Sequence, residues 1–96
     1  MSEKPSGLPE QMPEGFRLIY QGEPLLPFYA AEMLRPYLGR TVWVMDDAGR
    51  TRCGEMTAVP NVREDRTENV PPVEFADERP LYLRRIVCMA YYEPPR

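Results

Sequence analysis

The first apolar pattern along the chain predicts a short β-strand at 16–20. The sequence FRLIY places apolar side chains at every second position there, which is the period of a strand. The polar residues at 21–23 favour a turn, and Pro24 cannot continue a regular strand. We therefore expect the strand to end before Pro24.

The next pattern has the longer period of a helix. Phe28, Ala31 and Leu34 are three residues apart and share one helix face. Pro27 suits the first turn of a helix, where its missing N–H costs nothing. Pro36 disfavours helical backbone at the residue before it, so the helix should end near Arg35. A helix of about two turns is not stable alone, and we expect it to pack on a sheet.

The stretch 39–59 predicts a β-hairpin. Residues 41–45 are β-branched and aromatic, and strand character resumes at 50–59 after the turn-forming sequence DDAG. Gly49 suits a positive φ in the turn. Gly54 lies inside the second strand, where a glycine is typical of a bulge or a sharp bend. The hairpin therefore indicates a strongly curved sheet.

The last third of the chain holds a loop and a long strand. Residues 60–80 contain four prolines and a solvated run of mixed charge at 63–68. This segment is either a functional loop or hides a short edge strand at 70–75. Residues 81–92 are apolar on both strand faces, which predicts a central strand that is covered on each side.

These elements predict a mainly β protein with one short α-helix. We expect residues 16–96 to form a single small domain with a variable loop at 60–80. Its sheet should be antiparallel and strongly curved, or closed into a barrel. Residues 1–15 carry three prolines and no apolar period, which predicts a flexible or loosely docked N-terminal arm.

Composition excludes more chemistry than it suggests. The chain has no histidine, which removes the commonest general base and the usual nucleophile pairs. Two cysteines cannot complete a zinc site without carboxylates. The acidic pairs at 46–47 and 64–65 fit a turn and a solvated loop, and no phosphate-binding or nucleophile motif is present. We therefore expect no catalytic residue, no cofactor, no metal site and no enzymatic activity.

The cysteines and the first residues bear on location. Cys53 and Cys88 lie in predicted strands and outside any C-x-x-C motif, so both are expected to be reduced, buried thiols. The polar start of the chain lacks the apolar core of a signal peptide. Its apolar runs are also too short to span a bilayer. We expect a cytoplasmic protein with no membrane partner.

Several short motifs of this chain resemble those of a known protein family. They are Gly39-x-x-Val42-x-Val44, Gly49-Arg50 and Gly54-x-Met56, followed later by Leu83-Arg84-Arg85-Ile86-Val87. Over residues 27–92, their order resembles the Sm-like branch of the SH3-like small β-barrels, which implies a barrel of that type. The chain departs from the family at Arg85, where glycine is expected. It also departs at Pro60, near the place of an RNA-binding aspartate.

Four arginines are candidates for contact with a partner. Arg84 and Arg85 lie among apolar residues of the last predicted strand, so they should point to opposite faces. Arg50 and Arg52 lie on the hairpin, and all four could touch a phosphate or an acidic partner. Twelve Lys and Arg stand against fifteen Asp and Glu, a net charge of −3. General binding to nucleic acid should therefore be absent or weak.

Three aromatic residues complete the candidate set. Trp43 is expected either to pack under the helix with Phe28 or to stand exposed as an anchor for a partner. Tyr91 and Tyr92 beside two prolines could form an apolar patch, and a homodimer is its expected use.

The sequence thus predicts a non-enzymatic protein-binding module. It would be an adaptor or a small inhibitor of a larger protein complex, such as one that processes nucleic acid, of the kind that phages and bacteria encode. One alternative is an Sm-like or SH3-like nucleic-acid-associated module that uses the four arginines. Another is a small subunit of a larger enzyme. A continuous arginine face with exposed aromatics would favour nucleic acid, and a mixed face with apolar surface would favour protein.

Overall fold

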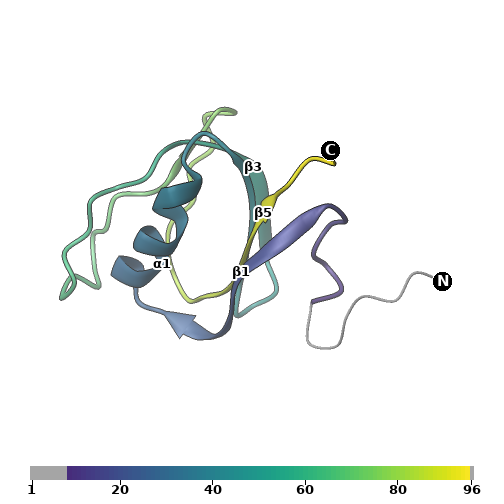
Figure 1. Cartoon of the computed structure of the whole chain (residues 1–96). Coiled ribbons are helices and arrows are strands. Elements are labelled where there is room, and N and C mark those ends of the chain that lie inside the picture. Colours follow the sequence, from purple (N-terminus) through teal and green to yellow (C-terminus); the bar gives the residue numbers. More distant parts are fainter. Residues whose placement is uncertain (1–8, 96) are drawn as a thin grey trace.

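Five antiparallel strands form one curved sheet in the computed structural model, which describes residues 9–95 (Figure 1). The strand order is β1-β5-β2-β3-β4, so β1 and β4 are edges and the sheet is not closed. The mainly β class with one short helix is confirmed. The elements are β1 (Phe16–Leu25), α1 (Pro27–Leu34), the 3-10 turn η1 (Arg35–Tyr37), β2 (Thr41–Asp46), β3 (Thr51–Ala58), β4 (Glu74–Phe75) and β5 (Ile86–Tyr92).

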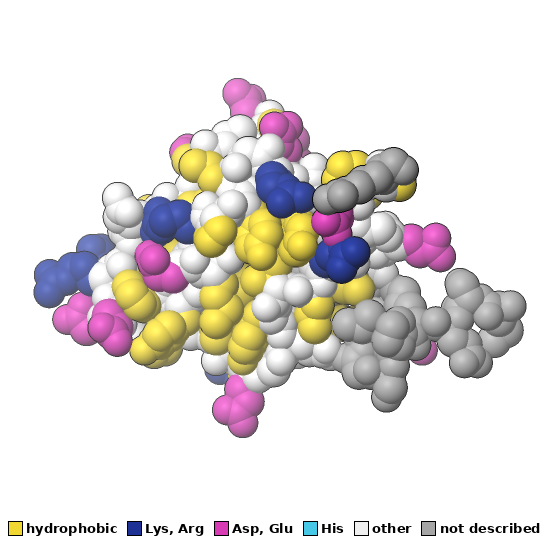
Figure 2. Space-filling view, viewed as in Figure 1, with side chains coloured by type: hydrophobic (Ala, Val, Ile, Leu, Met, Phe, Trp, Pro, Cys, Tyr) yellow, Lys and Arg dark blue, Asp and Glu magenta, His cyan; other side chains and the backbone are white. Residues whose placement is uncertain are grey.

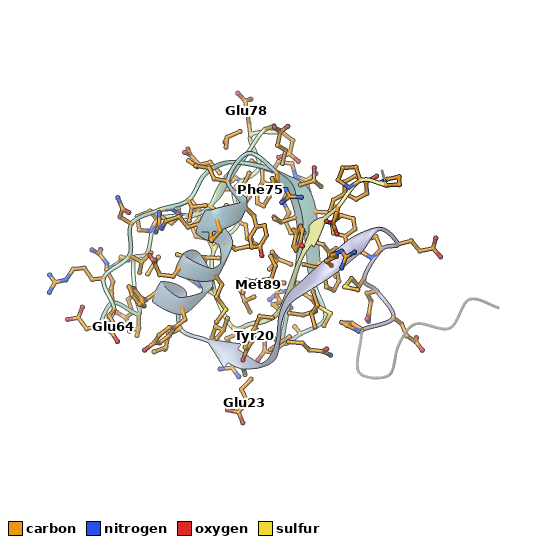
Figure 3. The ribbon with its side chains drawn as sticks, viewed as in Figure 1. Tyr20, Glu23, Glu64, Phe75, Glu78 and Met89 are labelled. Atoms are coloured by element: carbon orange, nitrogen blue, oxygen red, sulfur yellow. The ribbon has the colours of Figure 1, made fainter. Side chains whose placement is uncertain are left out.

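Strand β1 is longer than predicted. It reaches Leu25, and the expected turn at 21–23 is instead part of an irregularity between the pairs Gln21–Cys88 and Leu25–Ile86. The Tyr20 hydroxyl donates a hydrogen bond to the Glu23 carbonyl (2.7 Å), and both residues are labelled in Figure 3. A Cβ at Gly22 would lie 2.8 Å from that hydroxyl oxygen, so a larger residue there would require the Tyr20 side chain to move.

Helix α1 covers one face of the sheet. Its boundaries confirm the prediction, and the next residues form the 3-10 turn that contains Pro36. Ala31 and Leu34 are fully buried in one cluster with Val42, Val44 and Met89. Figure 3 shows Met89 in the middle of the molecule, between α1 and the sheet. Burial of this apolar face holds a helix that is too short to persist alone.

The other face of the sheet has its own small cluster. Successive side chains of a strand alternate between faces, so Trp43 points away from Val42 and Val44. Trp43 is 3% exposed and packs with Cys88, Ala90 and Met12. Both expectations for Trp43 were therefore wrong, since it is neither under the helix nor exposed.

Met12 shows how the described part of the predicted N-terminal arm lies. Residues 1–8 of that arm lie outside the described residues. Residues 10–11 form a turn, and the Met12 N–H donates to the Pro9 carbonyl (3.2 Å). Met12 is 4% exposed, so this part of the arm is docked on the sheet.

The predicted strand at 81–92 was too long at its start. Strand β5 begins at Ile86, lies between β1 and β2, and has buried side chains on both faces, which confirms the central position. Leu81 makes an isolated bridge to Val73, and a bend follows at 84–85. Arg85 has a φ of 50°, which a regular strand does not contain.

The segment 60–80 is part loop and part edge strand. Residues 63–69 are exposed, as predicted, and β4 falls within the expected edge strand. Val62, Val73 and Phe75 are buried, so much of the segment is packed against the rest of the molecule. A Cβ at Gly54 would lie 3.0 Å from the Phe75 ring, so that glycine makes room for β4.

Candidate functional site

A groove of about 620 Å³ opens between the β2–β3 turn and the segment 81–86. All four predicted arginines line it, and we call it the arginine groove. Its apolar wall comes from Val44, Leu81, Tyr82 and Ile86, and its other lining residues are Asp46, Asp47 and Thr51. The fold therefore brings together residues that are more than thirty positions apart in the sequence.

The β2–β3 turn holds Arg50 at one side of the groove. Asp46 Oδ1 accepts hydrogen bonds from the N–H groups of Ala48 (3.0 Å) and Arg50 (2.9 Å). Asp46 Oδ2 accepts a hydrogen bond from Arg50 Nε (3.0 Å). Burial alone would raise the pKa of Asp46, but these bonds and the Arg50 charge outweigh it and lower the pKa below its usual value. Gly49 has a φ of 83°, as the turn requires.

Arg52 is fully used within the fold. Its Nη2 donates to Asp77 Oδ1 (2.6 Å) and to the Arg79 carbonyl (2.8 Å), and its Nη1 donates to the Cys53 carbonyl (2.7 Å). Its guanidinium carbon lies 4.3 Å from the centre of the Phe75 ring. Only 16% of the Arg52 side chain is exposed. Arg52 therefore ties β3 to the segment after β4, and it has little capacity left for a partner.

The bend at 84–85 carries the other two arginines. Arg85 Nε donates to the Asp47 carboxylate, and the Asp47 N–H donates to the Arg85 carbonyl (3.0 Å). The Arg84 N–H donates to the Tyr82 carbonyl (2.9 Å). Among residues 9–95, no side chain or carbonyl accepts a hydrogen bond from the Arg84 guanidinium. The expectation that Arg84 and Arg85 lie in mid-strand on opposite faces was wrong, because they precede β5.

Charge in the groove is mixed. The lining holds four arginines and two aspartates, an excess of two positive charges. Asp46 pairs with Arg50 and Asp47 with Arg85, and Asp77 beside the groove pairs with Arg52. Tyr82 lies in the wall and is 55% exposed. This residue was missed because we assigned it to a covered strand. Its exposed place in the groove depends on the bend at 84–85, which the sequence pattern did not predict.

The remaining candidates lie elsewhere. The Tyr91 ring stacks on Tyr37 with 4.5 Å between centroids, and the Arg40 guanidinium lies 4.8 Å from the Tyr91 centroid. Tyr92 packs instead on Phe16, at 5.5 Å. Successive positions in β5 place the two tyrosines on opposite faces, so they do not form the single patch that we expected. The homodimer stays a prediction, without that patch as its basis.

The face that carries α1 and β1 is also mixed. Figure 2 shows hydrophobic side chains gathered at its centre, with basic and acidic side chains placed around them. Arg17 of β1 forms an ion pair with Glu93, and the Tyr29 hydroxyl of α1 donates to Glu64 Oε1 (3.1 Å). Positive charge on this face is therefore balanced locally rather than collected in one stripe.

The cysteines divide into two kinds. Cys88 is buried, as predicted, whereas Cys53 is exposed and corrects the expectation for it. Burial raises the pKa of both thiols, and the Arg52 charge offsets part of that rise at Cys53. Within residues 9–95, no group of three or more cysteine or carboxylate side chains could hold a metal ion. No helix in the same range is long and apolar enough to cross a membrane.

Comparison with known proteins adds no family. No family model, curated protein or solved structure matches this chain.

Proposed function

We propose that this protein is a non-enzymatic protein-binding module, an adaptor or small inhibitor, and that its arginine groove takes an acidic segment of a partner protein. The observation that carries the proposal is the state of the four arginines. Arg52 is committed to the fold, and Arg50 and Arg85 are exposed but paired. The guanidinium of Arg84, beside the exposed Tyr82, has no hydrogen-bond partner among residues 9–95. Arginine and tyrosine are frequent among the residues that dominate protein interfaces.

The small charge excess favours protein over nucleic acid. A groove whose lining is positive by two charges would release about two counterions from a nucleic acid, which gives weak, salt-dependent binding. A single carboxylate side chain needs only one arginine, and a bidentate pair with Arg84 would satisfy both. The apolar wall would at the same time cover an apolar neighbour of that carboxylate.

A nucleic-acid-associated module is the second candidate. The convergence of four arginines and Tyr82 on one groove supports it, as does the resemblance to the SH3-like and Sm-like small barrels. Bases of a single strand can stack on an exposed aromatic ring. The Sm-like identity belongs to this second proposal, because the open sheet alone fits other small β folds equally well.

Differential capture tests the first proposal. The parent protein, Arg84→Glu and Arg63→Glu are immobilised and exposed to a nuclease-treated lysate of the source cell, and the retained proteins are identified by mass spectrometry. Arg63 is a matched control, because it is exposed and lines no part of the arginine groove. We expect a protein that the parent and Arg63→Glu retain and that Arg84→Glu loses.

Two outcomes would contradict this proposal. If the same proteins are retained by all three chains, the groove is not the binding surface. If proteins are retained only from a parallel lysate without nuclease treatment, and the parent binds a single-stranded oligonucleotide at physiological salt, the second candidate replaces the first.

A further inference from the structure

A second groove meets the arginine groove at the 84–85 bend. It has a volume of about 570 Å³ and is lined by Arg84 and Arg85, which also line the first groove. Its apolar lining is Pro24, Leu25, Leu26, Pro27 and Leu83, and the remaining residues are Thr67, Glu68 and Asn69. We call it the leucine groove. Because the two grooves share two arginines, they lie next to each other at the bend.

The far wall of the leucine groove belongs to the segment 66–69, which makes hydrogen bonds within itself. Arg66 Nε donates to the Glu68 carbonyl (3.1 Å), and Arg66 Nη2 donates to the Asn69 carbonyl (3.0 Å). Asn69 has a φ of 55°, a left-handed conformation that asparagine adopts more readily than most residues. These two hydrogen bonds hold the segment 66–69 in a local bend on this side of the groove.

The near wall of the leucine groove exposes apolar side chains to solvent. Leu83 is buried and forms the floor, whereas Leu26 is 48% exposed between β1 and α1. Large apolar side chains that stand in a groove beside charged groups are typical of a site that is covered by a partner.

We propose that one extended peptide segment of the partner occupies both grooves, with a carboxylate on Arg84 and an adjacent apolar side chain on Leu26. This inference rests on the proposed function and adds the chemistry of the segment that is recognised. Charge complementarity supports it through Arg84, which makes no ion pair among residues 9–95, whereas Arg85 is paired with Asp47. Glu68 is the one carboxylate in the lining of the leucine groove. The apolar surface distinguishes this segment from a polyphosphate chain, which has no apolar group to place beside Leu26.

Selection from a displayed library of short random peptides tests the inference. The parent protein is the bait, and the enriched peptides are then synthesised and titrated by fluorescence anisotropy. We expect enrichment of an Asp or Glu next to a Leu, Ile, Val or Phe. Arg84→Glu and Leu26→Ser should each weaken the binding of such a peptide by about tenfold, since each removes one anchor.

The controls are matched in chemistry and exposure. Leu38→Ser changes an exposed leucine of similar accessibility between η1 and β2, outside both grooves, and Arg63→Glu changes an exposed arginine outside both. Both controls should bind like the parent. The emission of Trp43, the single tryptophan, reports whether each variant keeps the fold.

The outcomes separate the two proposals. Enrichment of acidic peptides that Leu26→Ser and Leu38→Ser bind equally would overturn the inference and leave the proposed function standing. Enrichment without acidic residues, or binding that Arg84→Glu leaves unchanged, would overturn both.

Discussion

Asp47 and Arg85 are joined twice, once through side chains and once through the backbone. The Arg85 guanidinium donates to the Asp47 carboxylate, and the Asp47 N–H donates to the Arg85 carbonyl (3.0 Å). Between them they fix the β2–β3 turn to the bend before β5. Arg85 holds a φ of 50° in that bend, which costs a residue with a Cβ about 1–2 kcal/mol.

The first prediction compares Arg85→Gly with Arg85→Val. Both variants lose the exposed ion pair, so the difference between them reports the backbone alone. Glycine accepts the left-handed conformation, whereas a β-branched side chain does not. We expect the glycine variant to have the higher free energy of unfolding in urea, by about 1–2 kcal/mol. Equal stabilities would show that residue 85 is not left-handed in solution.

The sequence located those elements whose signals are local. Pro27 begins the helix and Pro36 follows its end, so α1 lies where the pattern predicted. Gly49 lies in the hairpin turn, and β2 and β3 on either side of it also lie where they were predicted. Position 85 is instructive in another way. The local pattern predicted a regular strand there, whereas the structure shows a positive φ, a backbone conformation that glycine favours.

What local patterns could not predict depends on contacts between distant segments. Trp43 has the alternation of any strand residue, and its burial follows from Met12, which docks from thirty-one positions away. The sequence pattern predicts a strand at 84–85 because apolar residues continue on both sides. In the structure these two residues form a bend, and Asp47 pairs with Arg85 there. The four arginines were identified as candidates from the sequence. Only their contacts show that Arg52 is structural and that, within residues 9–95, Arg84 is the one of the four without an ion pair.

The second prediction concerns Met12. Replacing Met12 with alanine removes most of the side chain that covers Trp43. We expect the free energy of unfolding to fall by about 2 kcal/mol, the lower end of the range for a buried methionine. The Trp43 emission should shift to longer wavelength as water reaches the indole. Gln11→Ala, at the exposed neighbour, is the control. An unchanged emission in Met12→Ala would mean that the segment is not docked.

The third prediction is a pH dependence that belongs to Asp46. Its pKa is lowered in the folded protein, so the carboxylate adds stability above the pKa of about 3.9 that it has in the unfolded chain. This contribution is lost as the pH falls through the lowered, folded pKa. Asp46→Asn keeps an oxygen that can accept the two backbone N–H groups but removes the charge.

Urea unfolding of the parent and of Asp46→Asn over a range of acidic pH measures this effect. We expect the parent to be the more stable protein near pH 6, with a difference that shrinks as the pH falls below the folded pKa. Asp77 also has a lowered pKa, chiefly through the Arg79 N–H, but it titrates in both proteins and cancels in the difference. A difference that stays constant with pH would contradict the assignment to Asp46.

The last prediction separates the two thiols by reactivity. Cys53 is exposed at the surface of β3, and Cys88 has no exposed area under Trp43 and Met12. A thiol reagent should therefore label one cysteine quickly in the folded protein and the second only as the protein opens. The reactive species is the thiolate, and partial burial raises the pKa of Cys53, so the fast rate should increase with pH beyond the usual thiol pKa of about 8.5.

Cys53→Ser should abolish the fast phase, and Cys88→Ser the slow one. Two fast thiols in the parent would show that the cluster around Trp43 is open in solution. No reactive thiol in the unfolded, unreduced protein would show that the cysteines are oxidised.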